Sequence, residues 1–207
     1  MKQLIAWISL ILFVLLNTGC PKPCVEANYS FAGSLQLTPD VDSIRIGDTL
    51  FISTSFSNSL TDQSTGSLIN YSNANDIECT LSVAQLISGD SIPKGAVAQF
   101  KYSSQLGSIY NSVNIPSPDL VQQIKYQQVG NNYQLRVGLI ALNKGIYALG
   151  IGNGLSNTRN NTSACEKANF NFSISGTNQH AYYFQKWRPD FVLSTDGLSK
   201  LYCFKVY

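Results

Sequence analysis

Residues 42–56 read DSIRIGDTLFISTSF, and from Leu50 onward every second position takes part in one pattern. Leu50, Ile52 and Phe56 are apolar, and Thr54 continues their spacing. Successive side chains of a β-strand point to opposite faces, so this alternation predicts a strand with one buried face. A helix would need apolar residues three and four positions apart, and this stretch does not provide them.

The same period of two recurs along the chain. It appears in 29–37, 77–83, 100–102, 145–151, 169–176 and 200–207. In IKYQQVGNNYQLRVGLIAL, residues 124–142, two β-rich runs flank Gly130, Asn131 and Asn132, which predicts a hairpin. Because a sheet with one apolar face must cover it with another sheet, we expect an all-β fold, an antiparallel β-sandwich.

Helices are expected to be short and few. SPDLVQQI, residues 117–124, offers Ser117 as an N-cap and Pro118 in the first turn. TNQHAYYFQKW, residues 177–187, is followed by Pro189, which ends a helix. These two segments are the candidate helices.

The amino terminus has the features of an export signal. Lys2 supplies a positive charge, and 4–16 is apolar apart from Ser9, shorter than the ~20 residues of a membrane span. Asn17, Thr18 and Gly19 then precede Cys20, and this end resembles the lipobox of bacterial lipoproteins. The resemblance implies that Cys20 carries a lipid and that a membrane is a partner through this anchor; the alternatives are a free Cys20 or an uncleaved anchor.

Four further cysteines remain if Cys20 is acylated: Cys24, Cys79, Cys165 and Cys203. An exported chain meets an oxidising compartment, so we expect two disulfides, for which four cysteines allow three pairings. A metal site would need close pairs such as C-x-x-C, and these cysteines are far apart. We therefore expect no metal and no cofactor.

Composition narrows the class of partner. Charged residues make up 13% of the chain and the formal net charge is +2. Nucleic-acid binding draws on clustered Lys and Arg, so no nucleic-acid partner is expected. A glycan or a protein is the expected kind of ligand.

Two stretches resemble parts of immunoglobulin-like domains. In 42–56, an edge strand, a turn at Gly47 and Asp48, and a core strand follow one another. In LNKGIYALGI, residues 142–151, Tyr147 lies two residues after Gly145 and is the candidate tyrosine corner. The expected fold is thus an Ig-like β-sandwich.

The order DSIRIGDTL, LTDQSTGSLINYSNAN, NKGIYALGI, CEKANFNF and NQHAYYF, behind the lipobox, is similar to uncharacterised lipoproteins of Bacteroidetes-type bacteria. The resemblance implies a signal peptide over 1–19, a lipid-anchored tether over 20–27 and a β-sandwich over 28–207. It also implies the outer membrane as the location. No acidic run follows Cys20, which favours the periplasmic face over the cell surface.

The same lineage implies O-glycosylation where Asp, Ser or Thr, and an aliphatic residue follow one another. The three candidates are Ser43, Thr49 and Ser91. The alternative is that such pairs simply begin strands after turns, where their side chains bond the backbone.

Catalytic patterns are sparse. His180 is the only histidine, and a hydrolase of the Ser-His or Cys-His type needs one. Ser91 and Lys94 have S-x-x-K spacing, but Pro93 opposes the helix which that motif requires. We therefore assign no catalytic residue, and calcium at Asp40, Asp42 and Asp48 is only a minor alternative.

Binding is expected instead. Tyr182, Tyr183 and Trp187 lie close together and are candidates for stacking on sugars or anchoring a protein, the alternative being that they cap one end of the sandwich. The polar segment 153–165 is a second candidate surface. The leading hypothesis is a noncatalytic envelope lipoprotein; a hydrolase of glycans or peptides and a structural subunit of an envelope complex are the alternatives.

Overall fold

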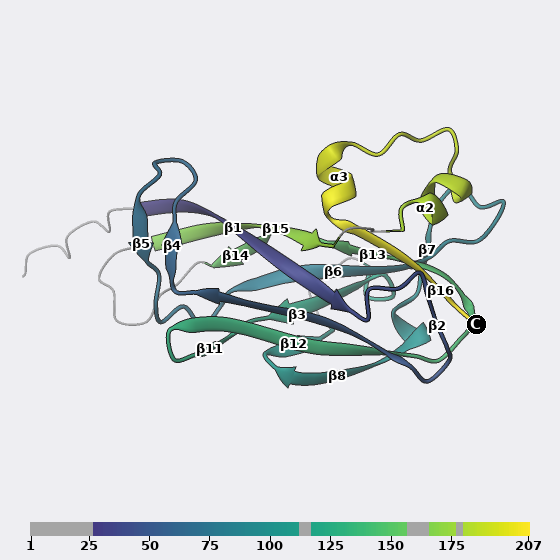
Figure 1. The fold of residues 1–207 in the computed structure, drawn as a ribbon, viewed down its shortest axis with the longest axis horizontal. Coiled ribbons are helices and arrows are strands. Elements are labelled where there is room, and N and C mark those ends of the chain that lie inside the picture. The colour runs from purple at the N-terminus through teal and green to yellow at the C-terminus, as the bar shows by residue number, and fades with distance from the viewer. Residues whose placement is uncertain (1–26, 112–116, 157–165, 177–179) are drawn as a thin grey trace, which may run out of the picture.

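The computed structural model describes residues 27–111, 117–156, 166–176 and 180–207. The leader, Cys20, Cys24, Cys165, residues 157–165 of the polar segment and residues 177–179 lie outside this part. Within it the fold is a β-sandwich (Figure 1). None of its helices has the length and apolar content of a membrane span.

One layer of the sandwich is built from six strands in the order β11 and β8 at one edge, then β12, β3, β1 and β15. Their bounds are β1 Ala27–Thr38, β3 Thr49–Ser57, β8 Phe100–Leu106, β11 Gln127–Val129, β12 Asn132–Ala141 and β15 Glu166–Ser175. Most ladders are antiparallel, as predicted, but β1 and β15 pair in parallel.

The second layer has the order β9, β10, β6, β13, β16 and β2. The strands of this layer are β2 Ser43–Ile44, β6 Glu78–Gln85, β7 Lys94–Gly95, β9 Ser108–Tyr110, β10 Val121–Lys125, β13 Gly145–Ile151 and β16 Leu201–Val206. β7 adds to β6, and β2 pairs in parallel with β16. β14, Gly154–Ser156, pairs with both β6 and β15 and so joins the two layers.

The remaining elements lie outside the two layers. They are the hairpin β4 Ser59–Thr61 and β5 Leu68–Asn70, the 3-10 helix η1 Val97–Gln99, and the helices α2 Tyr182–Trp187 and α3 Thr195–Ser199. Figure 1 shows α2 and α3 in the half of the molecule that carries the carboxyl terminus and the β4–β5 hairpin at the other end.

The core between the layers is aromatic, and it confirms the alternation in 50–56. Leu50 and Ile52 are buried in it, and Phe56 packs against it. Phe100 from one layer meets Tyr147 from the other edge-on, with ring centroids 4.8 Å apart. The apolar set expected from the period of two therefore forms the interface between the layers.

Three local predictions are confirmed. Gly47 has φ +88°, and the Asp48 carboxylate accepts a hydrogen bond from the Arg45 amide at 2.8 Å. β11 and β12 form the predicted hairpin at Gly130. The Tyr147 hydroxyl donates to the Asn143 carbonyl at 3.0 Å, which is the geometry of a tyrosine corner.

The predicted helix at 117–124 is wrong. Ser117 begins a turn closed by a hydrogen bond from the Leu120 amide at 3.0 Å, and the chain then enters β10. Gln122 and Ile124 alternate inward there and pair with β6, so sheet pairing outweighs the local helix signals. The second predicted helix, 177–187, is confirmed for Tyr182–Trp187 as α2, and α3, capped by the Ser194 side chain, was not predicted.

Candidate functional site

The aromatic residues of α2 cover part of the outer face of the second layer. Tyr183, Phe184 and Trp187 pack on a small apolar cluster that includes Leu86 and Cys203. The Trp187 indole N–H donates to the Ile87 carbonyl at 2.8 Å. Packing against this cluster thus explains the position of Tyr183 and Trp187. Both residues also line a cavity of about 130 Å³.

Tyr182 is the most exposed of the three candidate binding aromatics, at 49%. Its hydroxyl donates to the Asp42 carboxylate at 3.2 Å, and its ring lies 4.3 Å from that of Tyr183. The hydrogen bond to Tyr183, then burial and the carboxylate of Asp42, raise the pKa of the Tyr182 phenol. Tyr182 thus ties α2 to the segment between β1 and β2.

His180 lies next to this helix and is 6% exposed. Its Nε2 is 3.7 Å from an Asp40 carboxylate oxygen, and its ring meets that of Tyr202 edge-on at 5.3 Å. An imidazole enclosed in this way is better placed to support packing than to take a proton from a substrate.

The three aspartates considered for calcium make separate contacts. Asp40 lies beside His180, and Asp42 accepts hydrogen bonds from Ser43 and Tyr182. Asp48 stabilises the turn at Gly47. Across the described ranges, no group of three or more His, Cys, Asp or Glu side chains is placed to hold a metal ion.

The described cysteines, Cys79 and Cys203, are buried free thiols, and the described part of the chain contains no disulfide. Cys203 of β16 pairs with Ala148 of β13, and Ala148 pairs in turn with Ala84 of β6, so the three side chains lie on the same face of the sheet. Cys79 is an odd number of positions from Ala84, so it faces the core while Cys203 faces α2.

Opposite faces exclude a bridge between Cys79 and Cys203. Burial raises the pKa of both thiols to about 12, which keeps them protonated and unreactive near neutral pH. The expected pair of disulfides therefore finds no support at these two positions. Bridges to Cys24 or Cys165 involve residues outside the described part.

The three candidate O-glycosylation residues lie in different settings. Ser91 is exposed in the loop between β6 and β7. Ser43 and Thr49 are half-buried in β2 and β3. Ser91 is thus the most accessible of the three.

A hollow crosses the outer face of the first layer, and we call it the polar groove. Its volume is about 560 Å³. Its lining residues are Ser34, Gln36, Ser53, Thr54, Ser55, Leu106, Gln134, Leu135 and Arg136. They come from β1, β3, β12 and the end of β8.

The groove lies where β1 and β3 separate. These strands pair only from Gln36 to Thr38, opposite Phe51 to Ser53. Beyond that point the Thr54 hydroxyl donates to the Ser34 carbonyl at 2.6 Å, a side-chain contact in place of a ladder bond. The outward side chains Ser34, Gln36, Ser53 and Ser55 therefore lie around an opening in the sheet that Thr54 partly fills.

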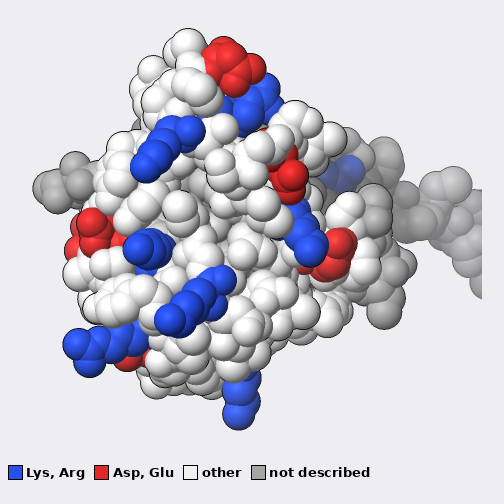
Figure 2. Space-filling view, turned by 90° about the vertical axis from the view of Figure 1, so that its right-hand side faces the viewer, with Lys and Arg blue, Asp and Glu red and all other residues white. Residues whose placement is uncertain are grey.

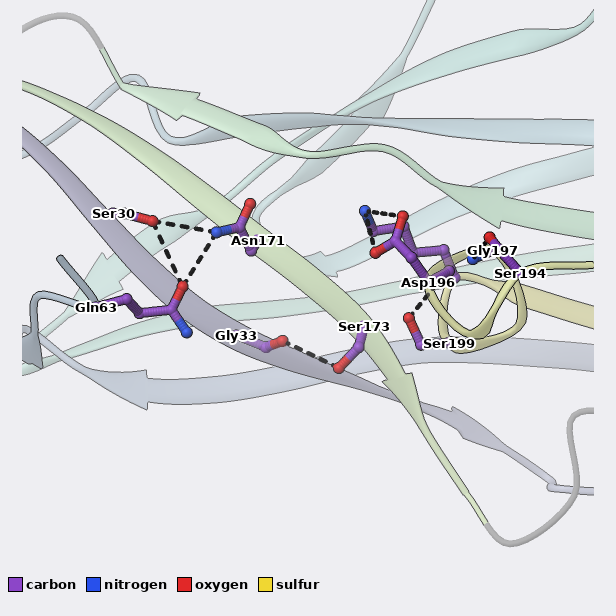
Figure 3. Close-up of polar contacts among 10 residues, drawn as sticks. Ser30, Gly33, Gln63, Asn171, Ser173, Ser194, Asp196, Gly197 and Ser199 are labelled. Carbon is purple, nitrogen blue, oxygen red and sulfur yellow. Dashed lines mark hydrogen bonds and ion pairs between the residues drawn. The ribbon is translucent and has the colours of Figure 1, made fainter.

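The loop of the β4–β5 hairpin crosses the other end of this opening. The Ser30 amide donates to the Asp62 carboxylate at 2.9 Å, and the Gln63 amide donates to the Ser30 carbonyl at 2.7 Å. Figure 3 shows the side chains of Ser30, Gln63 and Asn171 pointing toward one another there. The Asn171 amide donates to both partners at 3.1 Å.

Asp62 is 2% exposed and organises this loop. Hydrogen bonds from the Ser64 hydroxyl, the Ser30 amide and the Thr65 hydroxyl hold the pKa of the Asp62 carboxyl well below its usual range. A carboxyl group with a lowered pKa stabilises the fold fully at pH values above its unfolded pKa of ~3.9. This contribution decreases as the pH falls from that value toward the lower pKa of the folded state.

We expect Asp62→Asn to lower the melting temperature near neutral pH and the difference from the unmodified protein to shrink toward about pH 3. The amide lacks the charge, and its NH₂ cannot accept the two hydroxyl bonds made to Oδ2. Thermal unfolding followed by circular dichroism over a pH series measures this. Asp90→Asn, at an exposed loop position, is the control. Equal differences at both pH values would contradict the assignment.

Sequence reasoning did not identify the polar groove. Apart from Thr54, Leu106 and Leu135, its lining is the outward half of the alternation in β1, β3 and β12, where Ser, Gln and Arg136 stand between core residues. That signal was visible, but any solvated sheet face shows it. The predicted residues Tyr182, Tyr183 and Trp187 are not among the groove residues.

Comparison with known proteins gives fold-level similarity only. No family model and no curated protein matches the chain. The Reelin-N domain of F-spondin has a TM-score of 0.32 and 11% identity, covering 71% of this chain and 83% of that one. The human F-spondin reeler domain has the same TM-score and identity, and the match covers 72% of this chain and 87% of that one.

A type II cohesin domain from the cellulosome of Acetivibrio cellulolyticus has a TM-score of 0.29 and 9% identity, covering 67% of this chain and 95% of that one. At these values the likeness is a distant one between β-sandwich folds. The resemblance to uncharacterised lipoproteins remains a prediction.

Proposed function

We propose that this chain is a noncatalytic binding module that holds a glycan in the polar groove. A lipid on Cys20 would tether it to the outer membrane, on the periplasmic face. The anchor and the location rest on the leader sequence, and the binding role rests on the groove.

The chemistry of the lining supports a glycan. Sugars present many neutral hydroxyl groups, which pair with hydroxyl and amide side chains that both donate and accept. Such side chains predominate in the groove: Ser34, Gln36, Ser53, Thr54, Ser55 and Gln134. Leu106 adds apolar contact area. A volume of about 560 Å³ is within the usual range for ligand sites.

The hydrolase alternative has less support. Its required base, His180, is 6% exposed and does not line the groove. The groove itself contains hydroxyl and amide groups without an acid or an imidazole among its lining residues. Such a lining binds a ligand but supplies no proton acceptor near neutral pH.

Filling the groove tests the proposal. We expect Ser55→Trp to weaken binding to immobilised glycans by at least about 10-fold, because the indole would occupy an exposed position in the lining. Binding is measured on an array of bacterial and plant polysaccharides. Asn169→Trp is the matched control, because it places the same side chain at an exposed strand position of the same layer, outside the groove.

Binding by the unmodified protein and by Asn169→Trp, with loss in Ser55→Trp, is the expected result. The proposal is overturned if the unmodified protein binds no glycan on the array, or if Ser55→Trp binds as well as the control.

A further inference from the structure

We infer that the glycan bound in the polar groove is acidic and that Arg136 binds its carboxylate. This inference rests on the proposed function and names the class of ligand. It comes from the distribution of charge over the first layer and from the way the Arg136 side chain is held.

Acidic residues are nearly absent from the strands of the first layer. The chain has 12 Asp and Glu residues, yet among the strands of this layer only Glu166, at the start of β15, is acidic. The cations in the same strands are Lys101, Arg136 and Lys167. The outer face of this layer therefore favours a negatively charged ligand.

The end of the molecule seen in Figure 2 provides a contrast. Acidic and basic side chains both occur there, several of them side by side. The near absence of carboxylates is thus a property of the first layer and not of the whole surface.

Arg136 is the single charged residue in the lining of the groove. Its guanidinium carbon lies 4.4 Å from the centroid of the Phe51 ring, and its Nε donates to the Gln105 side chain at 2.6 Å. Stacking and this hydrogen bond hold the guanidinium plane before any ligand arrives, which reduces the entropy lost on binding.

The outer nitrogens of Arg136 remain available for a ligand. Within the described ranges, the ion pairs involve Lys125, His180, Arg188 and Lys200, and no carboxylate pairs with Arg136. Its one side-chain hydrogen bond there uses Nε. The fork of the two Nη groups matches a planar carboxylate, which accepts two parallel hydrogen bonds.

A single cation among neutral side chains suits a ligand with isolated single charges. Densely phosphorylated or sulfated polymers draw their affinity from several clustered cations. A uronic acid fits better, because its carboxylate would meet Arg136 while its hydroxyls meet Ser53, Ser55 and Gln134.

The test compares polysaccharides with and without their carboxylates. Alginate, polygalacturonate, hyaluronan and heparosan are each measured by calorimetry beside a form in which the carboxyl groups are reduced to alcohols. We expect the protein to bind at least one native polymer and to lose about 10- to 100-fold in affinity on reduction. Arg136→Gln is expected to lose the same factor for the native polymer and to be indifferent to reduction.

Lys101→Gln is the matched control, because it removes one positive charge from the same layer at an exposed residue outside the groove. We expect it to change affinity by less than about 2-fold, since exposed charges are screened at ordinary ionic strength. Circular dichroism and melting temperature establish that each variant is folded. Equal losses in Lys101→Gln and Arg136→Gln would overturn the assignment to Arg136.

Failure of this inference differs from failure of the proposed function. If the protein and Arg136→Gln bind a neutral glycan equally and Ser55→Trp does not, the glycan site stands and the acidic ligand is excluded. Binding to none of the four native polymers also overturns the inference. Tighter binding to polyglutamate than to the polysaccharides would overturn both, in favour of an acidic peptide.

Discussion

Replacing Phe172 with alanine is expected to lower the free energy of unfolding by about 3 to 5 kcal/mol. The ring is 1% exposed and stacks on Tyr126 at 5.0 Å and on Phe170 at 5.8 Å. Truncation removes these contacts and leaves a cavity at the centre of the aromatic core. Chemical denaturation measures the change.

Two glycines flank the same ring. Because they have no side chains, few neighbouring atoms can move into the cavity that the missing ring leaves. A Cβ atom on Gly33 would lie 2.4 Å from the Phe172 ring, and one on Gly154 would lie 2.6 Å from it. Gly33→Ala alone should therefore be destabilising, because Tyr126 and Phe170 prevent the ring from moving.

In the Phe172→Ala background, the Gly33→Ala change should cost little or restore part of the stability, since its methyl group enters the vacated space. A double-mutant cycle on these two positions measures the coupling. Simple addition of the two effects would show that the ring and Gly33 do not share this space.

Replacing Tyr133 with phenylalanine is expected to cost roughly 2 to 4 kcal/mol, although it removes a single oxygen atom. The Tyr133 hydroxyl accepts from the Ala74 amide at 3.0 Å and donates to the Tyr71 carbonyl at 2.6 Å. Tyr71 and Ala74 are buried. The variant would leave a donor and an acceptor without this partner, away from water. Chemical denaturation again provides the measurement.

Tyr147→Phe is the matched control for this change. It also removes one hydroxyl from a buried ring, but its main partner is the carbonyl of Asn143, an exposed residue of the corner before β13. Water can replace that bond, so we expect a cost of about 1 kcal/mol or less. A cost for Tyr133→Phe no larger than that for Tyr147→Phe would refute the role given to the buried pair.

Much of the fold could be predicted from local patterns. The alternation in 50–56 identified β3 and its inward face, and the Gly130 segment identified the β11–β12 hairpin. Tyr147 was assigned to a tyrosine corner, which the bond to Asn143 confirms. Each of these features depends on residues a few positions apart, so their chemistry is visible in the sequence.

Local patterns were misleading where distant pairing decided the outcome. Ser117 and Pro118 have the chemistry of a helix start, yet Gln122 and Ile124 pair with β6 and form a strand. Tyr183 and Trp187 form an aromatic cluster typical of binding, yet they pack on an apolar patch made by Leu86 and by residues of β13 and β16. The identity of the surface beneath a segment is a tertiary property.

The sequence by itself determined which segments are strands and which faces they bury, because side-chain alternation and turn chemistry act over neighbouring residues. The tertiary structure decided where β1 and β3 separate and that Arg136 lies in a groove of neutral side chains. The strand neighbours of β1, β3 and β12 are set by packing across the whole core, so residues far apart in sequence meet only once that core has formed.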